Sequence, residues 1–251
     1  ATPQLAAHMA FALGVMPLIL AAMGYFVPVL TRSSPLGLAA WGPPLLALAG
    51  GALAVGAFAT NFSPNVLGIA ALVALLAAAS LGGWMLVRAR RMFGPRHRGL
   101  DWYLAALGFL LLALLAVVLM PWFPAQRGGL RLFHLHANLL GFVGLTALGT
   151  LRVLLPTCLR QPDPEVATRL RTDLKWAVGG TLLIAFGASS LLPASLAPLG
   201  PPLALFGSGL YGYVVLRMLS AWMARFGIAL MRVDGAAPSL AAAALGLLGV
   251  L

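Results

Sequence analysis

The chain has 251 residues, of which 61% are hydrophobic and 8% are charged, and its formal net charge is +11 at pH 7. A typical soluble domain carries about 25% charged residues, so this composition excludes a water-soluble globular protein, which could not cover its surface with so few charges. It predicts instead one transmembrane helical domain over residues 1–251, an all-α polytopic bundle.

Apolar runs of about 20 residues, enough to cross the hydrocarbon core of a bilayer as a helix, recur along the chain. Seven spans are expected, near residues 5–30, 37–58, 66–87, 102–121, 132–155, 176–195 and 202–228. An eighth run, from residue 237 to Leu251, is short for a full span. The bundle is therefore expected to have seven or eight helices.

The basic residues stand at the ends of these runs, which favours a role in membrane topology and in contacts with lipid headgroups over nucleic-acid binding. Five arginines lie between Arg88 and Arg98 and predict a cytoplasmic loop. Alternation of seven spans then places 14 of the 16 basic residues inside, with only Arg127 and Arg131 outside. We therefore expect an outside N-terminus and a multi-pass protein of a bacterial inner membrane.

Carboxylates are expected only in cytoplasmic loops or at their edges. The five acidic residues are Asp101, Asp163, Glu165, Asp173 and Asp234. Proton pumps and ion-coupled transporters usually need a carboxylate within the membrane, so proton pumping by this chain alone is not expected. The single Cys158 excludes an internal disulfide framework and a cysteine metal cluster.

Three histidines lie in apolar runs: His8 early in the first span, and His134 and His136 early in the fifth. Both spans enter the membrane from the outside, so all three are expected at one depth near the outer face. Neutral imidazole is the usual protein ligand of haem iron. Polar contacts between neighbouring helices would explain the same residues without a cofactor. His97, in the basic loop, is expected to be solvated or to face lipid.

Helix geometry separates the two histidines of the fifth span. His134 and His136 point about 200° apart, because each residue of an α-helix turns about 100°. They cannot bind the same metal, but one can meet His8 across a haem while the other faces a second centre. Met9, Met16 and Met23 repeat every seven residues along the first span, and a packing stripe is favoured over a set of metal ligands.

Two short motifs resemble a known family. The first span opens with His8, continues through Met16-Pro17 and ends with Phe26-Val27-Pro28, and the fifth opens with Phe133-His134-Leu135-His136-Ala137-Asn138. These segments resemble the second and tenth helices of haem-copper oxidase subunit I, the tenth especially in the nitric oxide reductase branch. Small NnrS-type haem membrane proteins are similar.

The resemblance implies that His8 and His136 are the axial ligands of a low-spin haem b. It also implies that His134 faces a second centre, either another haem or copper. If the resemblance selects the wrong histidine, His134 pairs with His8 and His136 faces away. The chain lacks the three further histidines of the family's distal metal site, which implies an electron-transfer subunit rather than a self-sufficient oxidase or reductase.

The expected function is therefore one-electron transfer near the periplasmic face by a haem b-binding subunit. Its expected partners are membrane lipid, other subunits of a larger respiratory-type complex, and a c-type cytochrome or quinol; nucleic acid is not expected. Two alternatives stay open: a non-redox transporter or structural membrane subunit, and a copper-binding membrane protein that uses His8, His134 and methionines.

The charge pattern makes a prediction about topology. In a variant lacking Cys158, single cysteines introduced between Arg88 and Asp101 should react only with reagents supplied from the cytoplasmic side. Cysteines introduced at residues 122–131 should react only from the outside. Labelling of the loop between Arg88 and Asp101 from the outside would reverse the predicted orientation and move the three histidines to the inner face.

Overall fold

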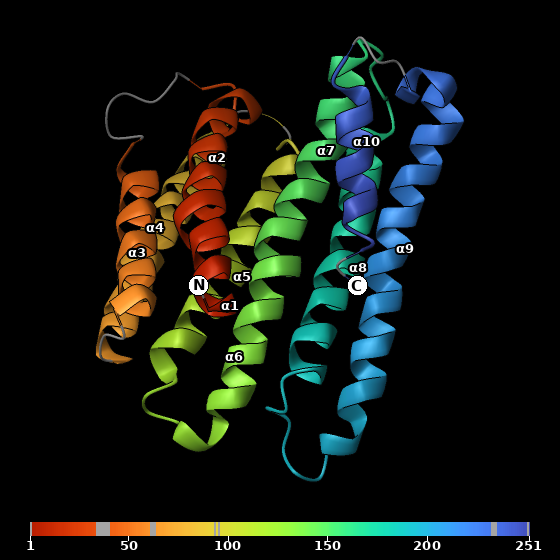
Figure 1. Cartoon of the computed structure of the whole chain (residues 1–251). Helices are drawn as coiled ribbons and strands as arrows, with labels where there is room; N and C mark the ends of the chain where they lie inside the picture. Colours follow the sequence, from red (N-terminus) through yellow and green to blue (C-terminus); the bar gives the residue numbers. More distant parts are fainter. Residues whose placement is uncertain are drawn as a thin grey trace.

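Helices lying side by side make up nearly all of the chain that this computed structural model describes, namely residues 2–33, 41–60, 64–92, 94, 96–231, 235–249 and 251 (Figure 1). No strand occurs among these residues, so the predicted all-α bundle is confirmed for them. The expected start of the second span at residue 37 and the charged residues Arg232 and Asp234 lie outside the described residues.

Two of the rods in the bundle are composite. The N-terminal rod joins α1 (Pro3–His8), the π-helical η1 (Met9–Val15) and α2 (Met16–Leu30). The α6–α7 rod joins α6 (Arg127–His136), the π-helical η4 (Ala137–Gly144) and α7 (Leu145–Cys158). The other helices are α3 (Gly42–Thr60), α4 (Pro64–Arg91), α5 (Gly99–Leu119), α8 (Val166–Gly187), α9 (Gly200–Phe226) and α10 (Ala237–Gly246). Short 3-10 turns are η3 (Pro124–Gln126), η5 (Ala197–Leu199) and η6 (Gly227–Met231).

Within the described residues, six helical segments are long and apolar enough to cross a membrane, fewer than the predicted seven or eight. They are Pro3–Leu30, Gly42–Thr60, Asn65–Arg91, Gly99–Leu119, Pro124–Cys158 and Ala197–Leu230. The span predicted at 176–195 corresponds to α8, which begins and ends earlier than predicted. Its first half carries four charged residues: Arg169, Arg171, Asp173 and Lys175.

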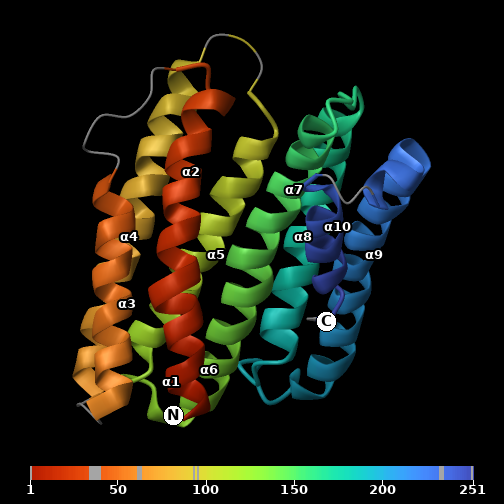
Figure 2. The ribbon, with the colours of Figure 1, turned by 45° about the horizontal axis from the view of Figure 1, so that its top comes forward.

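Despite its charges, α8 is a full-length member of the bundle. Its 22 residues extend roughly 33 Å at 1.5 Å per residue. It runs beside α9 in both views of the bundle (Figure 1, Figure 2). The short α10 lies in the segment predicted as an eighth helix and packs against α7 and α9. Within the part of the chain that the structure describes, the bundle thus contains seven long rods, of which six are apolar enough to cross a membrane by length and composition.

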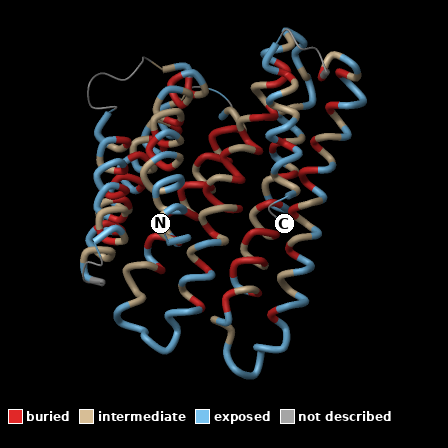
Figure 3. Tube along the Cα trace, in the orientation of Figure 1, coloured by how far each residue is buried: buried red, intermediate tan, exposed pale blue. Residues whose placement is uncertain are grey.

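On α4, small residues face the interior of the bundle and large apolar residues face outward. Ala70, Ala74 and Ala77 are at most 3% exposed, whereas Leu72 and Leu76 are 51% and 57% exposed. This arrangement fits a helix that packs through small residues and turns leucines toward lipid. Figure 3 shows buried positions concentrated on the rods in the middle of the bundle.

The closest approach between α8 and α9 depends on glycine. A Cβ atom at Gly180 would lie 2.8 Å from the carbonyl oxygen of Gly207, and one at Gly187 would lie 2.6 Å from that of Gly200. Both distances are shorter than van der Waals contact, so neither position of α8 accepts a side chain without a shift of the backbone. This contact holds α8 in the bundle although its first half is charged.

A buried ion-pair network joins α7, α8 and α9. Asp173 of α8 is fully buried; its Oδ2 lies 2.6 Å from Nη2 of Arg152 in α7, and its Oδ1 lies 3.2 Å from Nη1 of Arg217 in α9. The expectation that every acidic residue lies in a loop or at its edge is therefore wrong for Asp173, which lies roughly 10 Å inside α8. Two guanidinium groups pair with this carboxylate, and proton pumping by this chain alone is therefore still not expected.

This network makes a prediction about stability. An Asp173→Asn substitution removes the counter-charge from Arg152, which is only 3% exposed, and leaves a buried cation unpaired. We expect the free energy of unfolding to fall by about 3–5 kcal/mol, seen as a lower midpoint of thermal unfolding in detergent. The matched control is Asp101→Asn, which removes a partly exposed pair with Arg98 and should change stability by at most about 1 kcal/mol. Equal midpoints for the two variants would contradict this role of Asp173.

Candidate functional site

His8 is the last residue of α1, where the N-terminal rod passes into its π-helical segment. Its Nδ1 lies 2.8 Å from the carbonyl oxygen of Gln4, one turn earlier. The ring also stacks obliquely on Phe58 of α3, with 4.4 Å between the ring centroids. The orientation of the ring is therefore set by a hydrogen bond on one side and an aromatic contact on the other.

His134 lies in α6 and is held by a neighbouring helix. Its Nδ1 is 2.9 Å from the carbonyl oxygen of Ala113 in α5. Asn138, one turn further along, donates from Nδ2 to the backbone oxygen of His134 at 3.0 Å, and the same amide nitrogen lies 3.2 Å from the ring Nδ1 and 3.5 Å from Nε2. His134 is thus fixed against α5, with the amide of Asn138 beside both of its ring nitrogens.

His136 is bonded within its own helix, since its Nδ1 lies 2.8 Å from the carbonyl oxygen of Leu132. His8, His134 and His136 therefore share one arrangement. A carbonyl oxygen only accepts, so Nδ1 carries the proton in each neutral ring and Nε2 keeps its lone pair. Histidines that bind metals usually show this pattern, with one ring N–H donated to a carbonyl and the other nitrogen free for the metal.

Both histidine-bearing rods change to π-helix directly beside these residues. The segment η1 begins at Met9, next to His8, and η4 begins at Ala137, next to His136. Pro17, just after η1, lacks the backbone N–H that would bond to the preceding turn, which gives a physical reason for the change of register there. Short π-helical segments occur frequently at functional sites, where they alter the direction of nearby side chains.

A cavity of about 600 Å³ lies between the N-terminal rod and the α6–α7 rod, with α3, α4 and α5 completing its walls. His8 and His134 both line it, whereas His136 is not among its lining residues. Much of the remaining wall is apolar, and small residues such as Gly50, Ala54 and Ala74 leave the space open. The volume is within the range of about 300–1,000 Å³ found for small-molecule and cofactor sites.

The structure thus brings together two of the three predicted histidines. The resemblance implies a pair formed by His8 and His136, but the pair that shares the cavity is His8 and His134. This is the second of the two pairings left open by helix geometry. Among the residues that the structure describes, no group of three or more His, Cys, Asp or Glu side chains is arranged to hold a metal ion. Ligation of a metal by any of these histidines stays a prediction.

Three polar residues of the cavity wall were not predicted from the sequence: Gln4, Arg131 and Asn138. Their spacing relative to the histidines is the signal that identifies them. Gln4 precedes His8 by four residues, and Arg131, His134 and Asn138 follow at i, i+3 and i+7, the spacing of one helix face. Polar side chains from two rods therefore line the same cavity.

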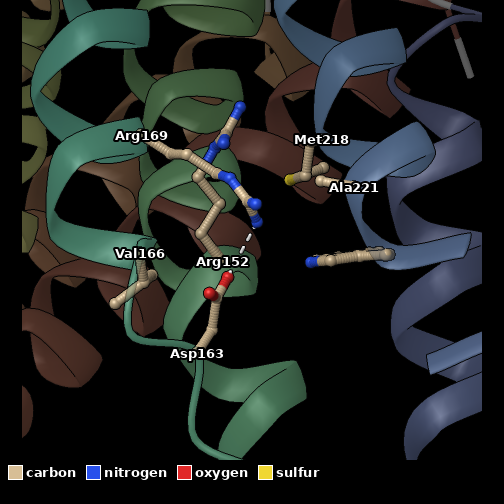
Figure 4. A pocket seen from close by; sticks show the side chains of 7 residues that line it. Arg152, Asp163, Val166, Arg169, Met218 and Ala221 are labelled. Atoms are coloured by element: carbon tan, nitrogen blue, oxygen red, sulfur yellow. Dashed lines mark hydrogen bonds and ion pairs between the residues drawn. The ribbon is translucent and has the colours of Figure 1, made fainter. Parts of the chain in front are cut away.

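His97 and a second, much smaller cavity lie apart from this site. His97 belongs to the loop between α4 and α5; its Nδ1 accepts a hydrogen bond from the backbone N–H of Gly99 at 3.1 Å, and burial lowers the pKa of its imidazole. A second cavity, of only about 10 Å³, lies beside Arg152, where Arg169 reaches Asp163 (Figure 4). A space of this size holds about one water molecule.

Comparison with protein families, with curated proteins and with solved structures finds no match to this chain. The fold defines the class as a multi-pass helical membrane protein. The cavity and the residues that line it are the features of the structure that bear on a more specific function.

Proposed function

We propose that this protein is a haem b-binding membrane subunit that transfers electrons one at a time. The observation that carries the proposal is the placement of His8 and His134, which come from rods far apart in the sequence and line one largely apolar cavity of about 600 Å³. Each ring has Nδ1 within hydrogen-bonding distance of a backbone carbonyl, the arrangement that metal-binding histidines usually show.

The walls of the cavity suit a flat apolar cofactor. Small residues on α3 and α4 leave room for a ring system, and most of the surface around it is apolar. The polarity of the surroundings, together with axial-ligand identity, is what a protein uses to set the reduction potential of a haem. Bound haem supplies reversible one-electron chemistry, and two histidine ligands leave no position at the iron for a substrate.

The proposal assigns different roles to the two histidines of α6. His134 shares the cavity with His8 and is proposed as the second axial ligand, in place of His136. His136 is half-buried and does not line the cavity that holds His8 and His134. The proposed centre is therefore a single haem.

The position of the cavity in the bundle also supports proposals for the location of the haem in the membrane and for the partners of the protein. The cavity lies at the ends of α1 and α6 opposite the arginine-rich end of α4, which supports a site near the periplasmic face of a bacterial inner membrane. A haem at that depth suits exchange of electrons with a c-type cytochrome or quinol within a larger respiratory-type complex.

Copper is less well supported by the same cavity. Met16 lines it together with His8 and His134, and methionine with histidine is a usual copper ligand set. However, Met16 lies eight residues after His8, on the order of 10 Å along the rod, which is too far for one ion to bind both. Met9 is 52% exposed and Met23 is buried in the core, so neither adds a ligand.

Substitution of single histidines tests the proposal. In protein purified from cells supplied with haem precursor, His8→Ala and His134→Ala should each abolish the low-spin absorption spectrum or convert it to a five-coordinate, high-spin form. His136→Ala is the matched control, two residues away on the same helix, and should keep the low-spin spectrum. Circular dichroism and gel filtration would verify that all three variants fold.

The opposite pattern identifies the other pairing. If His136→Ala loses the low-spin spectrum and His134→Ala keeps it, the pair implied by the resemblance is correct and the cavity is not the haem site. An unchanged spectrum in His8→Ala would contradict both pairings, because among the described residues no histidine besides His8 and His134 lines the cavity to take the place of His8.

A further inference from the structure

Arg131 is a positive charge on the wall of a largely apolar cavity. It lies one turn before His134 and on the same side of the α6–α7 rod as Asn138. The Arg131 side chain lines the cavity and is also exposed at the surface. Arginine is permanently charged, and its planar guanidinium binds carboxylates through two parallel hydrogen bonds. The identity of an anionic partner for Arg131 therefore bears on what the cavity holds.

No described acidic residue serves as that partner. Each of the four is paired with another arginine: Asp101 with Arg98, Asp163 and Glu165 with Arg169, and Asp173 with Arg152 and Arg217. These pairs belong to the opposite end of the bundle or to the α7–α9 network. Within the part of the chain that the structure describes, Arg131 thus faces the cavity without a carboxylate of the protein.

We propose that Arg131 binds a carboxylate of the molecule that occupies the cavity, an inference that rests on the proposed haem site. The ligand is then an amphiphile: its apolar ring lies among the small residues of α3 and α4, its metal meets His8 and His134, and its acidic group lies toward the start of α6. Arg131 fixes which way the ring faces and favours a carboxylate-bearing ring over a neutral one of the same shape.

Arg127 offers a matched control on the same helix. It precedes Arg131 by one turn and carries the same charge at the same end of the bundle, but it does not line the cavity. If Arg131 acts only through its positive charge or by attracting lipid phosphate, substitution of Arg127 should change ligand binding in the same way. If Arg131 contacts the ligand directly, only its own substitution should change binding.

The test measures affinity for two probes, iron protoporphyrin IX and its dimethyl ester, in which both carboxylates are neutral. Full-length haem-free protein in detergent is titrated with each probe, and the Soret band reports binding. The wild-type protein should prefer the acid over the ester by about tenfold, the size expected for one charge-assisted hydrogen bond. Arg131→Gln should bind both probes equally, Arg131→Lys should keep part of the preference, and Arg127→Gln should keep all of it.

Two results overturn the inference while leaving the haem site intact: a wild-type protein that binds both probes with a low-spin spectrum and equal affinity, or an Arg131→Gln variant that keeps the full preference. The second result would assign Arg131 to lipid headgroups. Failure of the wild-type protein to bind either probe is a distinct outcome, which removes the proposed haem site and this inference with it.

Discussion

A polar group within the hydrocarbon core of the bilayer must find its partner inside the protein, because lipid tails offer none. Helices meet that demand for the backbone. Small residues allow close contacts between rods, as in α4 and at Gly180 and Gly187 of α8, and leucines such as those of α4 face outward. The charged or polar side chains that enter the bundle are therefore few, and each one found there calls for a partner.

Two such sets of polar side chains lie in different parts of the bundle. The ion pairs around Asp173 join α7, α8 and α9 and are closed by residues of the protein itself. In the large cavity, His8, His134 and Arg131 line one space, and none of them forms an ion pair with a described acidic residue. The first set stabilises a helix with a charged start, and the second has the composition of a ligand site.

Much of the fold follows from the sequence because hydropathy and helix length are properties of single segments. The all-α bundle and the two histidine-bearing rods are predicted correctly on that basis. Asp173 is misplaced because Arg171 and Lys175 beside it resemble a loop in hydropathy, while burial by α7 and α9 decides that the residues are helical. The choice between His134 and His136 and the role of Arg131 depend on which faces of two distant rods meet, which no local pattern contains.

The central claim is that the cavity holds one haem, and an absorption spectrum of the purified wild-type protein tests it most directly. Protein from cells supplied with haem precursor should show a Soret band, a sharp α band on reduction with dithionite, and one haem per chain by extraction. A monodisperse, folded protein without a Soret band after the same preparation would contradict the account and favour a membrane protein whose histidines only join neighbouring helices.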